Sequence, residues 1–182
     1  ARSGFTPARS HFTQLPRISQ RTRDLARSLT RGLDNNYDRA AAIEGFFHNE
    51  FGYTLDLPRS ARDATLEYFL FDRMEGHCEY FSTAMVVLLR TLGIHSREVN
   101  GFLGGQWNDV GQYLAVTQNE AHSWVEVWFP RYGWVPFDPT PAEAGTSEAI
   151  TSWLWPGRFL LDGLQHRWNK WILDYNMESQ SG

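Results

Sequence analysis

The sequence predicts an α+β fold, in which a helical N-terminal half packs on a mostly antiparallel sheet and a further helix lies near the C-terminus. Two observations predict this class. Apolar residues recur at helical spacing up to Leu92, and after Gly93 the spacing changes to the alternation of β-strands. The length suits a single domain. We therefore expect one domain over 1–182, with a helical N-terminal part at 17–57, a core at 61–140 and a C-terminal helical segment at 150–176.

Five segments carry the apolar spacing of helices: 18–29, 37–51, 63–71, 80–92 and 158–175. The second shows it most clearly, because Ala40, Ile43, Phe47 and Phe51 would share one buried stripe. The fourth is apolar enough to be a buried helix, and Gly93 is placed to end it. The last, rich in aromatic residues, admits two uses. We favour packing on the domain over lying at a bilayer surface.

Four segments have the composition and spacing of strands: 95–102, 113–117, 123–129 and 134–137. Between the first two, the residues from Gly104 to Asp109 are polar and contain two glycines, which predicts a loop at the border of a groove. Trp107 lies in this segment and lacks the pattern of a core residue. We expect its indole to cover a substrate groove.

Composition excludes several classes of function. The net charge of −4 argues against nucleic acid, since binding a phosphate backbone requires a basic surface. The one cysteine, Cys78, permits no intramolecular disulfide. No pair of residues has metal-ligand spacing, and no oxygen-rich loop suggests calcium, so neither a metal nor another cofactor is predicted. No stretch reaches the roughly 18 apolar residues of a membrane-spanning helix.

Cys78 lies at the predicted start of a buried helix, directly after Gly76-His77. The unpaired N–H groups and the dipole of a helix N-terminus favour a negative charge there. With a nearby imidazolium, such a position lowers the pKa of a thiol from about 8.5 to roughly 4–7. The same N–H groups suit an oxyanion. The alternative is a buried structural cysteine. His77 either tunes the thiolate or faces solvent.

His122 and Asp138 flank a predicted hairpin with its turn at 130–133, which would bring them opposite each other. Such an aspartate can fix the tautomer of an imidazole that acts as a base. Taken singly, the histidine also suits a satisfied surface residue, and the aspartate suits a turn before proline. Glu126 shares the strand face of His122. It is either a substrate-binding acid or, as we favour, a partner for Arg97.

The order of these residues is a joint pattern, because His122 follows Cys78 by 44 positions and Asp138 follows by 16 more. In this pattern the sequence resembles the transglutaminase-like superfamily, whose papain-like core places the cysteine at a helix start and the other two residues on neighbouring strands. The resemblance covers about 61–140. The matching residues are Gly76-His77-Cys78, Phe81, Ala84, Gly93-Ile94, Arg97, Gly101-Phe102, Ala121 to Val127, Gly133-Trp134 and Phe137 to Thr140.

The chain is most similar to the extracytoplasmic domain of bacterial transglutaminase-like proteins that lies between membrane-spanning helices. A segment like 26–53, ending in a phrase similar to Asn49 to Thr54, precedes the core in that group. The resemblance implies a periplasmic domain of an inner-membrane protein. No tryptophan precedes Cys78, so the indole oxyanion donor of animal transglutaminases has no counterpart. Tyr68, His77 and the amide of Cys78 are the candidates for the second donor.

The resemblance further implies a cysteine-dependent acyl transfer, with Cys78 as nucleophile, His122 as base and Asp138 as its orienting residue. The acyl donor would be a glutamine side chain of a protein or peptide, the intermediate a thioester and the acceptor an amine. Two alternatives stay open. The same triad serves a cysteine peptidase or a deamidase, and a non-catalytic module that binds a peptide or cell-envelope polymer would keep the fold without turnover.

Overall fold

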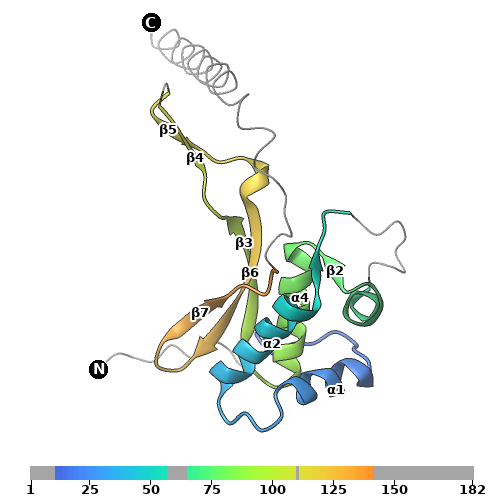
Figure 1. The fold of residues 1–182 in the computed structure, drawn as a ribbon. Coiled ribbons are helices and arrows are strands. Elements are labelled where there is room, and N and C mark those ends of the chain that lie inside the picture. The colour runs from blue at the N-terminus through green and yellow to red at the C-terminus, as the bar shows by residue number, and fades with distance from the viewer. Residues whose placement is uncertain (1–10, 57–64, 110, 142–182) are drawn as a thin grey trace, which may run out of the picture. The chain divides into compact units, whose positions relative to one another are not determined.

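The computed structural model describes residues 11–56, 65–109 and 111–141 (Figure 1). These residues belong to two compact units. The first holds the described residues up to Gly101 and those from His122 onward, and the second holds those of Phe102–Ala121. The expected helical segment at 150–176 lies outside the described residues, and a single domain over the whole chain stays a prediction.

The first two predicted helices are confirmed. Helix α1 spans Gln20–Leu29 and begins two residues later than expected, because the hydroxyl of Ser19 caps it by accepting the N–H of Thr22. Helix α2 spans Asn36–Glu50, and the side chain of Asn35 caps it in the same way. Its predicted stripe is buried, with Ala40, Ile43 and Phe47 fully inaccessible and Phe51 nearly so.

The third predicted helix is short and irregular. Helix α3 covers Leu66–Tyr68, and a π-helix, η1, continues through Phe69–Arg73. Two-residue strands then form where none was predicted. Strand β1 (Gly52–Tyr53) pairs in parallel with β2 (Glu75–Gly76), directly before the next helix. Such short pairing depends on segments distant in sequence, so no local pattern marks it.

Helix α4 spans Cys78–Thr91, and its first residue is Cys78, as predicted. Its burial matches the expected apolar helix, because seven of its hydrophobic side chains belong to the core: Phe81, Ala84, Met85, Val86, Val87, Leu88 and Leu89. The chain turns away just after the helix. Gly93 adopts a positive φ of 74°, which a residue with a side chain rarely does.

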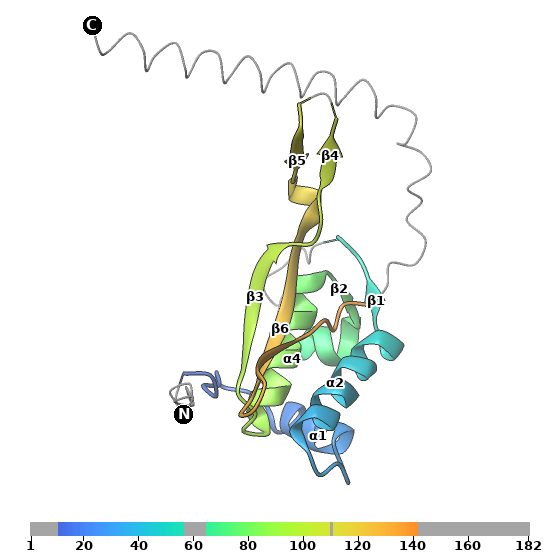
Figure 2. The ribbon, with the colours of Figure 1, turned by 90° about the vertical axis from the view of Figure 1, so that its left-hand side faces the viewer.

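The main sheet has three strands in the order β3-β6-β7. Strand β3 spans Ser96–Phe102, β6 spans Ala121–Phe129 and β7 spans Gly133–Phe137, close to three of the predicted strands. Figure 2 shows β3 and β6 side by side. Strands β6 and β7 are antiparallel, with Val125 opposite Phe137 and Phe129 opposite Gly133.

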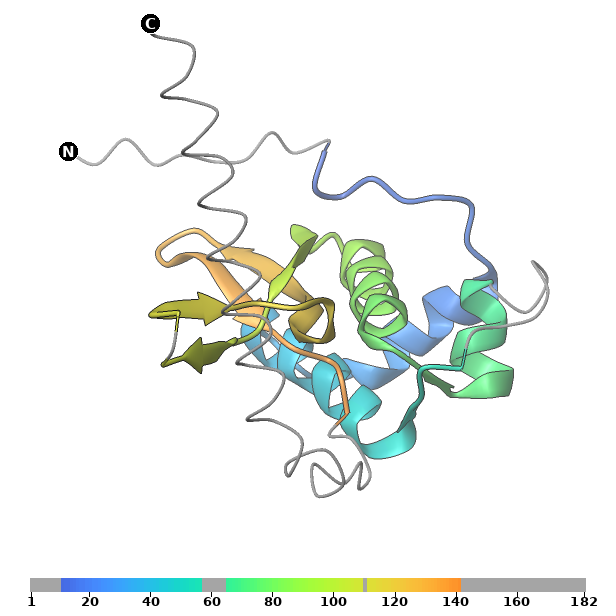
Figure 3. The ribbon, with the colours of Figure 1, turned by 90° about the horizontal axis from the view of Figure 1, so that it is seen from above.

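The predicted alternation along β6 is confirmed. Ser123, Val125 and Val127 are buried, whereas His122, Trp124, Glu126 and Trp128 are only partly covered. The helices α1, α2 and α4 lie to one side of the sheet (Figures 1 and 3). One hydrophobic core joins α2, α4 and the buried face of β6. This core fixes the elements that carry the candidate site.

In the second unit, β4 (Gln106–Asn108) and β5 (Tyr113–Ala115) form an antiparallel pair. The prediction of a loop from Gly104 to Asp109 is therefore wrong at its centre, because the backbone of Gln106–Asn108 pairs with β5. A 3₁₀ helix, η2 (Gln118–Glu120), follows, capped by Thr117. Strand β5 therefore ends at Ala115, two residues before the expected boundary.

These elements define the class. The observed order of helices and strands is the α+β arrangement that the sequence predicts. Among the described residues, no helix is both long and apolar enough to cross a membrane.

Candidate active site

The structure brings two of the predicted site residues into contact. His122 is near the start of β6 and Asp138 directly follows the end of β7. The antiparallel pairing of these strands joins them, and the Nε2 atom of His122 lies 2.7 Å from Oδ2 of Asp138. The imidazole side chain is 16% exposed, so solvent screens this interaction less than it screens a surface ion pair.

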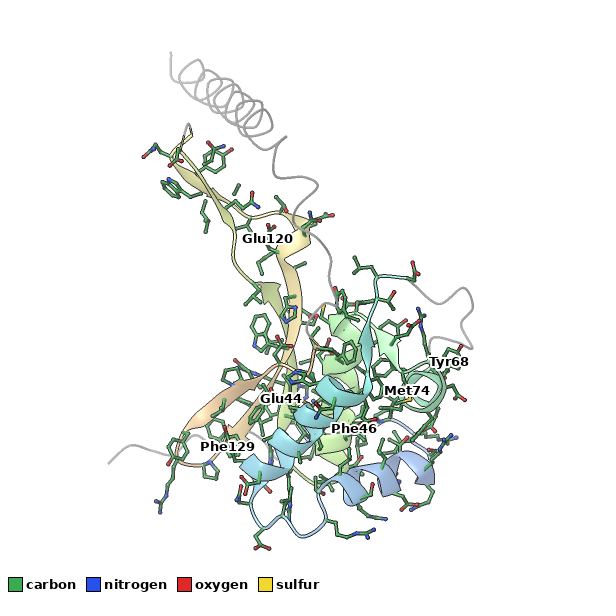
Figure 4. The ribbon with its side chains drawn as sticks, viewed as in Figure 1. Glu44, Phe46, Tyr68, Met74, Glu120 and Phe129 are labelled. Atoms are coloured by element: carbon green, nitrogen blue, oxygen red, sulfur yellow. The ribbon has the colours of Figure 1, made fainter. Side chains whose placement is uncertain are left out.

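Asp138 is held at each of its polar groups. Its Oδ1 atom accepts the backbone N–H of Thr140 at 3.1 Å, a local turn that orients the carboxylate. Its own N–H donates to Oε1 of Glu44 at 2.8 Å, and its carbonyl lies 2.7 Å from Nε2 of His48. Glu44, which Figure 4 labels, and His48 are both on α2, one helical turn apart.

The hydrogen bond to Asp138 defines the protonation of the neutral His122 ring. An ionised carboxylate only accepts hydrogen bonds, so Nε2 of His122 carries the proton and donates it. The unprotonated nitrogen of the neutral ring is then Nδ1. His122 therefore has a base at Nδ1 and an orienting partner at Nε2, which is the arrangement that general-base catalysis requires.

Cys78 is the first residue of α4 and is partly exposed. The residue before it, His77, is the N-cap, but its side chain makes no capping hydrogen bond. The ring of His77 instead packs edge-on against Tyr80, with 4.9 Å between centroids. Because His77 does not cap the helix, its side chain leaves the N–H groups of the first turn to other acceptors.

Gly76 explains how the chain reaches this helix start. It is buried in β2, and a Cβ atom there would lie 3.1 Å from Cβ of Tyr80 and 3.2 Å from Cε2 of Phe69. Those distances are tighter than ordinary carbon contacts. A glycine therefore lets β2 approach both η1 and α4 closely, which sets the position of Cys78.

The contact between Cys78 and His122 stays a prediction. Among the residues that the structure describes, the thiol makes no hydrogen bond to the imidazole. The cysteine and the histidine belong to elements that share one core, since α4 and β6 both contribute to it. The structure thus assembles the histidine and aspartate and places the cysteine at the helix start, as the sequence predicts.

The remaining predicted site residues have separate surroundings. Tyr68 is half-buried in α3, and Trp107 is 53% exposed on β4 in the second unit. Glu126 forms an ion pair with Arg97, at 2.6 Å from its Nη2 atom. The favoured interpretation of Glu126 agrees with this pair. Substrate or oxyanion roles for Tyr68, His77, Trp107 and Glu126 stay predictions.

Sequence reasoning missed Glu44 and His48. Their only signal is a spacing of four positions on a helix, which puts two polar side chains on one face. Many helices carry such pairs, so the spacing alone indicates no function. Asp138, which both residues bind, is more than 90 positions away from Glu44 along the chain. Among the described residues, no group of three or more His, Cys, Asp or Glu side chains could hold a metal ion.

Known proteins resemble this chain in sequence and in fold. The family model described as the transglutaminase-like superfamily matches residues 23–139. A Pseudomonas aeruginosa protein named protein-glutamine gamma-glutamyltransferase is 37% identical over 166 residues, covering 78% of this chain and 25% of its own length. Bacillus subtilis YebA, an uncharacterised protein, is 42% identical over 150 residues, covering 78% of this chain and 20% of its own.

A solved structure extends the likeness to three dimensions. The periplasmic domain of TgpA from Pseudomonas aeruginosa is 40% identical, with a TM-score of 0.65, and the match covers 72% of this chain and 46% of that one. The chain spans a quarter or less of the length of the curated relatives that it matches. The matched model covers most of the chain and includes Cys78, His122 and Asp138. The chain therefore belongs to the transglutaminase-like superfamily and has its papain-like core.

Proposed function

We propose that this chain catalyses cysteine-dependent acyl transfer on glutamine side chains of proteins or peptides, with Cys78, His122 and Asp138 as the catalytic triad. The observation that carries the proposal is the 2.7 Å hydrogen bond from His122 Nε2 to Asp138 Oδ2, which leaves Nδ1 as a base. The name of the Pseudomonas relative supports the choice of glutamine as acyl donor.

In the first half-reaction, Nδ1 of His122 takes the proton of the Cys78 thiol, and the sulfur attacks the carboxamide carbon of the substrate. The carbonyl oxygen becomes an oxyanion, for which the unpaired N–H groups at the start of α4 are the expected donors, while Tyr68, His77 and the amide of Cys78 stay candidates for the second donor. The C–N bond then breaks as His122 returns its proton to the leaving nitrogen. Ammonia departs, and a thioester joins Cys78 to the substrate.

In the second half-reaction, a primary amine attacks the thioester carbon. His122 accepts a proton from the amine nitrogen while the C–S bond breaks, and the proton returns to the sulfur. The product is a secondary amide, and Cys78 is regenerated. Asp138 keeps the ring oriented in both steps and stabilises its cationic form. No external oxidant or cofactor enters this balance.

The test is mass spectrometry of a glutamine-containing peptide incubated with the chain and an isotopically labelled primary amine. Incorporation of the amine with release of ammonia supports the proposal. The peptide should gain the labelled amine when it is incubated with the wild-type protein. It should not gain the amine with Cys78→Ala, because without the sulfur no thioester forms. Full activity in Cys78→Ala would refute the role of Cys78.

The same spectra separate the alternatives. A mass gain of about 1 Da on the glutamine indicates water as acceptor and therefore deamidation, and cleavage of the peptide backbone indicates a peptidase. Binding without any mass change indicates a non-catalytic module. Thiol alkylation at graded pH adds an independent criterion, because a binding module has no need of a cysteine that reacts well below pH 8.

We further propose that the protein containing this chain is anchored in a membrane and presents the domain outside the cytoplasm. The match to a domain described as periplasmic supports this location. The substrate would then be an extracytoplasmic protein or peptide. Protease accessibility of the domain in spheroplasts, with a cytoplasmic marker kept intact, tests the location.

A further inference from the structure

The peptide groups on both sides of the Asp138 Cα are held by one helix. Glu44 accepts the N–H of Asp138 at 2.8 Å, and Nε2 of His48 lies 2.7 Å from its carbonyl oxygen. A carbonyl only accepts, so His48 is the donor. Figure 4 shows Glu44 on the side of α2 that faces the strands. We refer to this pair of side chains as the α2 clamp.

The α2 clamp acts where the sheet no longer fixes the backbone. Strand β7 ends at Phe137, the last residue paired with β6, so Asp138 lies just beyond the ladder. Backbone groups need partners, but water would suffice here, because the side chain of Asp138 is 45% exposed. The side chains of Glu44 and His48 instead bind the N–H and the carbonyl oxygen of Asp138. A water-mediated arrangement would leave the Cα of Asp138 freer to move.

The clamp connects Asp138 to the rigid part of the molecule. Ile43 and Phe47 precede the two clamp residues by one position each on α2, and both are completely buried in the core. The helix therefore cannot shift without repacking that core. With the backbone held by α2 and Oδ1 held by Thr140, the remaining oxygen of Asp138 is directed at His122.

We propose that Glu44 and His48 are positioning residues for the acyl-transfer reaction, acting through Asp138 on the orientation and tautomer of His122; this rests on the proposed function. The reaction needs the ring of His122 held within a fraction of an ångström, and misplacement of a catalytic group by about 1 Å can cost roughly 100-fold in rate. Neither clamp residue touches the substrate in this proposal.

Kinetics of four variants test the clamp. Glu44→Ala removes the acceptor and should lower kcat by about 10- to 100-fold with little change in KM. Glu44→Gln keeps an oxygen at the same reach and should restore most of kcat. His48→Ala and His48→Gln form a second pair, because glutamine keeps an N–H donor. His48 is exposed, so these two variants should fold normally.

The matched control is Glu50→Ala. Glu50 is an exposed acidic residue at the end of the same helix, and it is not among the described residues that hydrogen-bond to Asp138. This variant should keep wild-type kcat. Thermal unfolding of every variant separates a loss of fold from a loss of positioning.

A readout independent of activity is the ¹⁵N NMR spectrum of His122 in a Cys78→Ala background at about pH 9, where an ordinary imidazole is neutral. The protein with an intact clamp should show the Nε2–H tautomer. Glu44→Ala and His48→Ala should add the Nδ1–H tautomer, and the glutamine variants should not. The His122 signals are assigned by their loss in His122→Gln.

Two results would overturn the clamp. One is unchanged kcat and an unchanged tautomer in both alanine variants. The other is a loss of kcat that glutamine does not restore, with the tautomer unchanged. If the wild-type chain incorporates no amine, the proposed function fails instead, and the tautomer alone then decides whether the clamp positions His122.

Discussion

A Cβ atom at Gly101 would lie 2.8 Å from the Cη2 atom of Trp124, so the indole of β6 occupies the space that a side chain on β3 would need. That indole also lies nearly parallel to the ring of His122, at 18° and 6.4 Å between centroids. Gly101 is therefore coupled to the proposed base through one aromatic ring. The residue matters for the site although it carries no functional group.

Gly101→Ala should reduce activity by displacing the indole from its place beside His122. Because a Cβ contact below 3.0 Å forces a shift, we expect a loss of about 1–3 kcal/mol in the free energy of unfolding. We also expect a fall in kcat measured where the variant is fully folded. Thermal unfolding by circular dichroism and amine-incorporation rates measure the two effects.

Gly45→Ala is the control for that variant. Gly45 is inside α2, and a Cβ atom there would have nothing within 4 Å. Alanine should therefore stabilise the helix by about 0.5–1 kcal/mol and leave kcat unchanged. Wild-type kcat in Gly101→Ala would contradict the coupling between Gly101 and His122.

Asp138→Asn should lower kcat by about 10²–10⁴-fold, although the two side chains have the same shape. The reason is specific to this site. Asp138 accepts two N–H groups, from His122 at Oδ2 and from Thr140 at Oδ1. An asparagine has one oxygen, so its amide N–H₂ would face one of these donors. Steady-state amine incorporation measures the loss, and Asp72→Asn, at an exposed position of η1, is the control.

The sequence alone predicted those parts of the fold and site that depend on local patterns. The apolar run after Cys78 predicted α4, and the alternation from Ser123 to Val127 predicted which residues share a face of β6. The favoured pairing of Glu126 with Arg97, 29 positions apart, is confirmed, although the sequence offered only the opposite charges of the two side chains as its basis. These inferences need only the period of an element or the charges of two side chains.

What the sequence could not predict depends on contacts across the fold. The clamp joins Glu44 to a backbone group 94 positions away, and a backbone N–H has no sequence signature. Strand β4 was missed because its three residues carry two polar side chains, and only pairing with β5 makes them a strand. The same holds for the two-residue strands β1 and β2, which pair in parallel.

The pH dependence of the second unit should follow Glu120. Its carboxylate accepts the hydroxyl of Thr117 at 2.6 Å and the N–H of Thr117 at 2.7 Å, and these bonds lower the pKa of Glu120 below the ordinary glutamate value. A lowered pKa means that the contribution of this cap is present above the unfolded-state pKa. It is lost as the pH falls through the folded-state pKa.

Thr117→Val should therefore raise the pKa of Glu120, because the hydroxyl is the largest cause of its shift. Thr117→Ser keeps the hydroxyl and should preserve the lowered value. The measurement is an NMR titration of the Glu120 carboxyl carbon in the three proteins. An identical pKa in wild type and Thr117→Val would show that the hydroxyl bond does not form in solution.

Glu126→Gln decides between an ion pair and a substrate-binding acid at that position. Both Nε and Nη2 of Arg97 bond to Oε2 of Glu126, and the guanidinium also lies 4.3 Å from the centre of the Trp134 ring. The side chains are 41% and 21% exposed, so loss of the charge should cost only about 0.5–1 kcal/mol in the free energy of unfolding. The aromatic contact of Arg97 remains in the variant.

The kinetics of Glu126→Gln show whether the carboxylate also binds substrate. If the carboxylate serves Arg97 alone, KM for the glutamine peptide and kcat should both match the wild type within about twofold. The reason is that an interaction absent from the substrate complex changes neither parameter. A rise in KM of tenfold or more, with unchanged thermal stability, would instead assign Glu126 to the substrate.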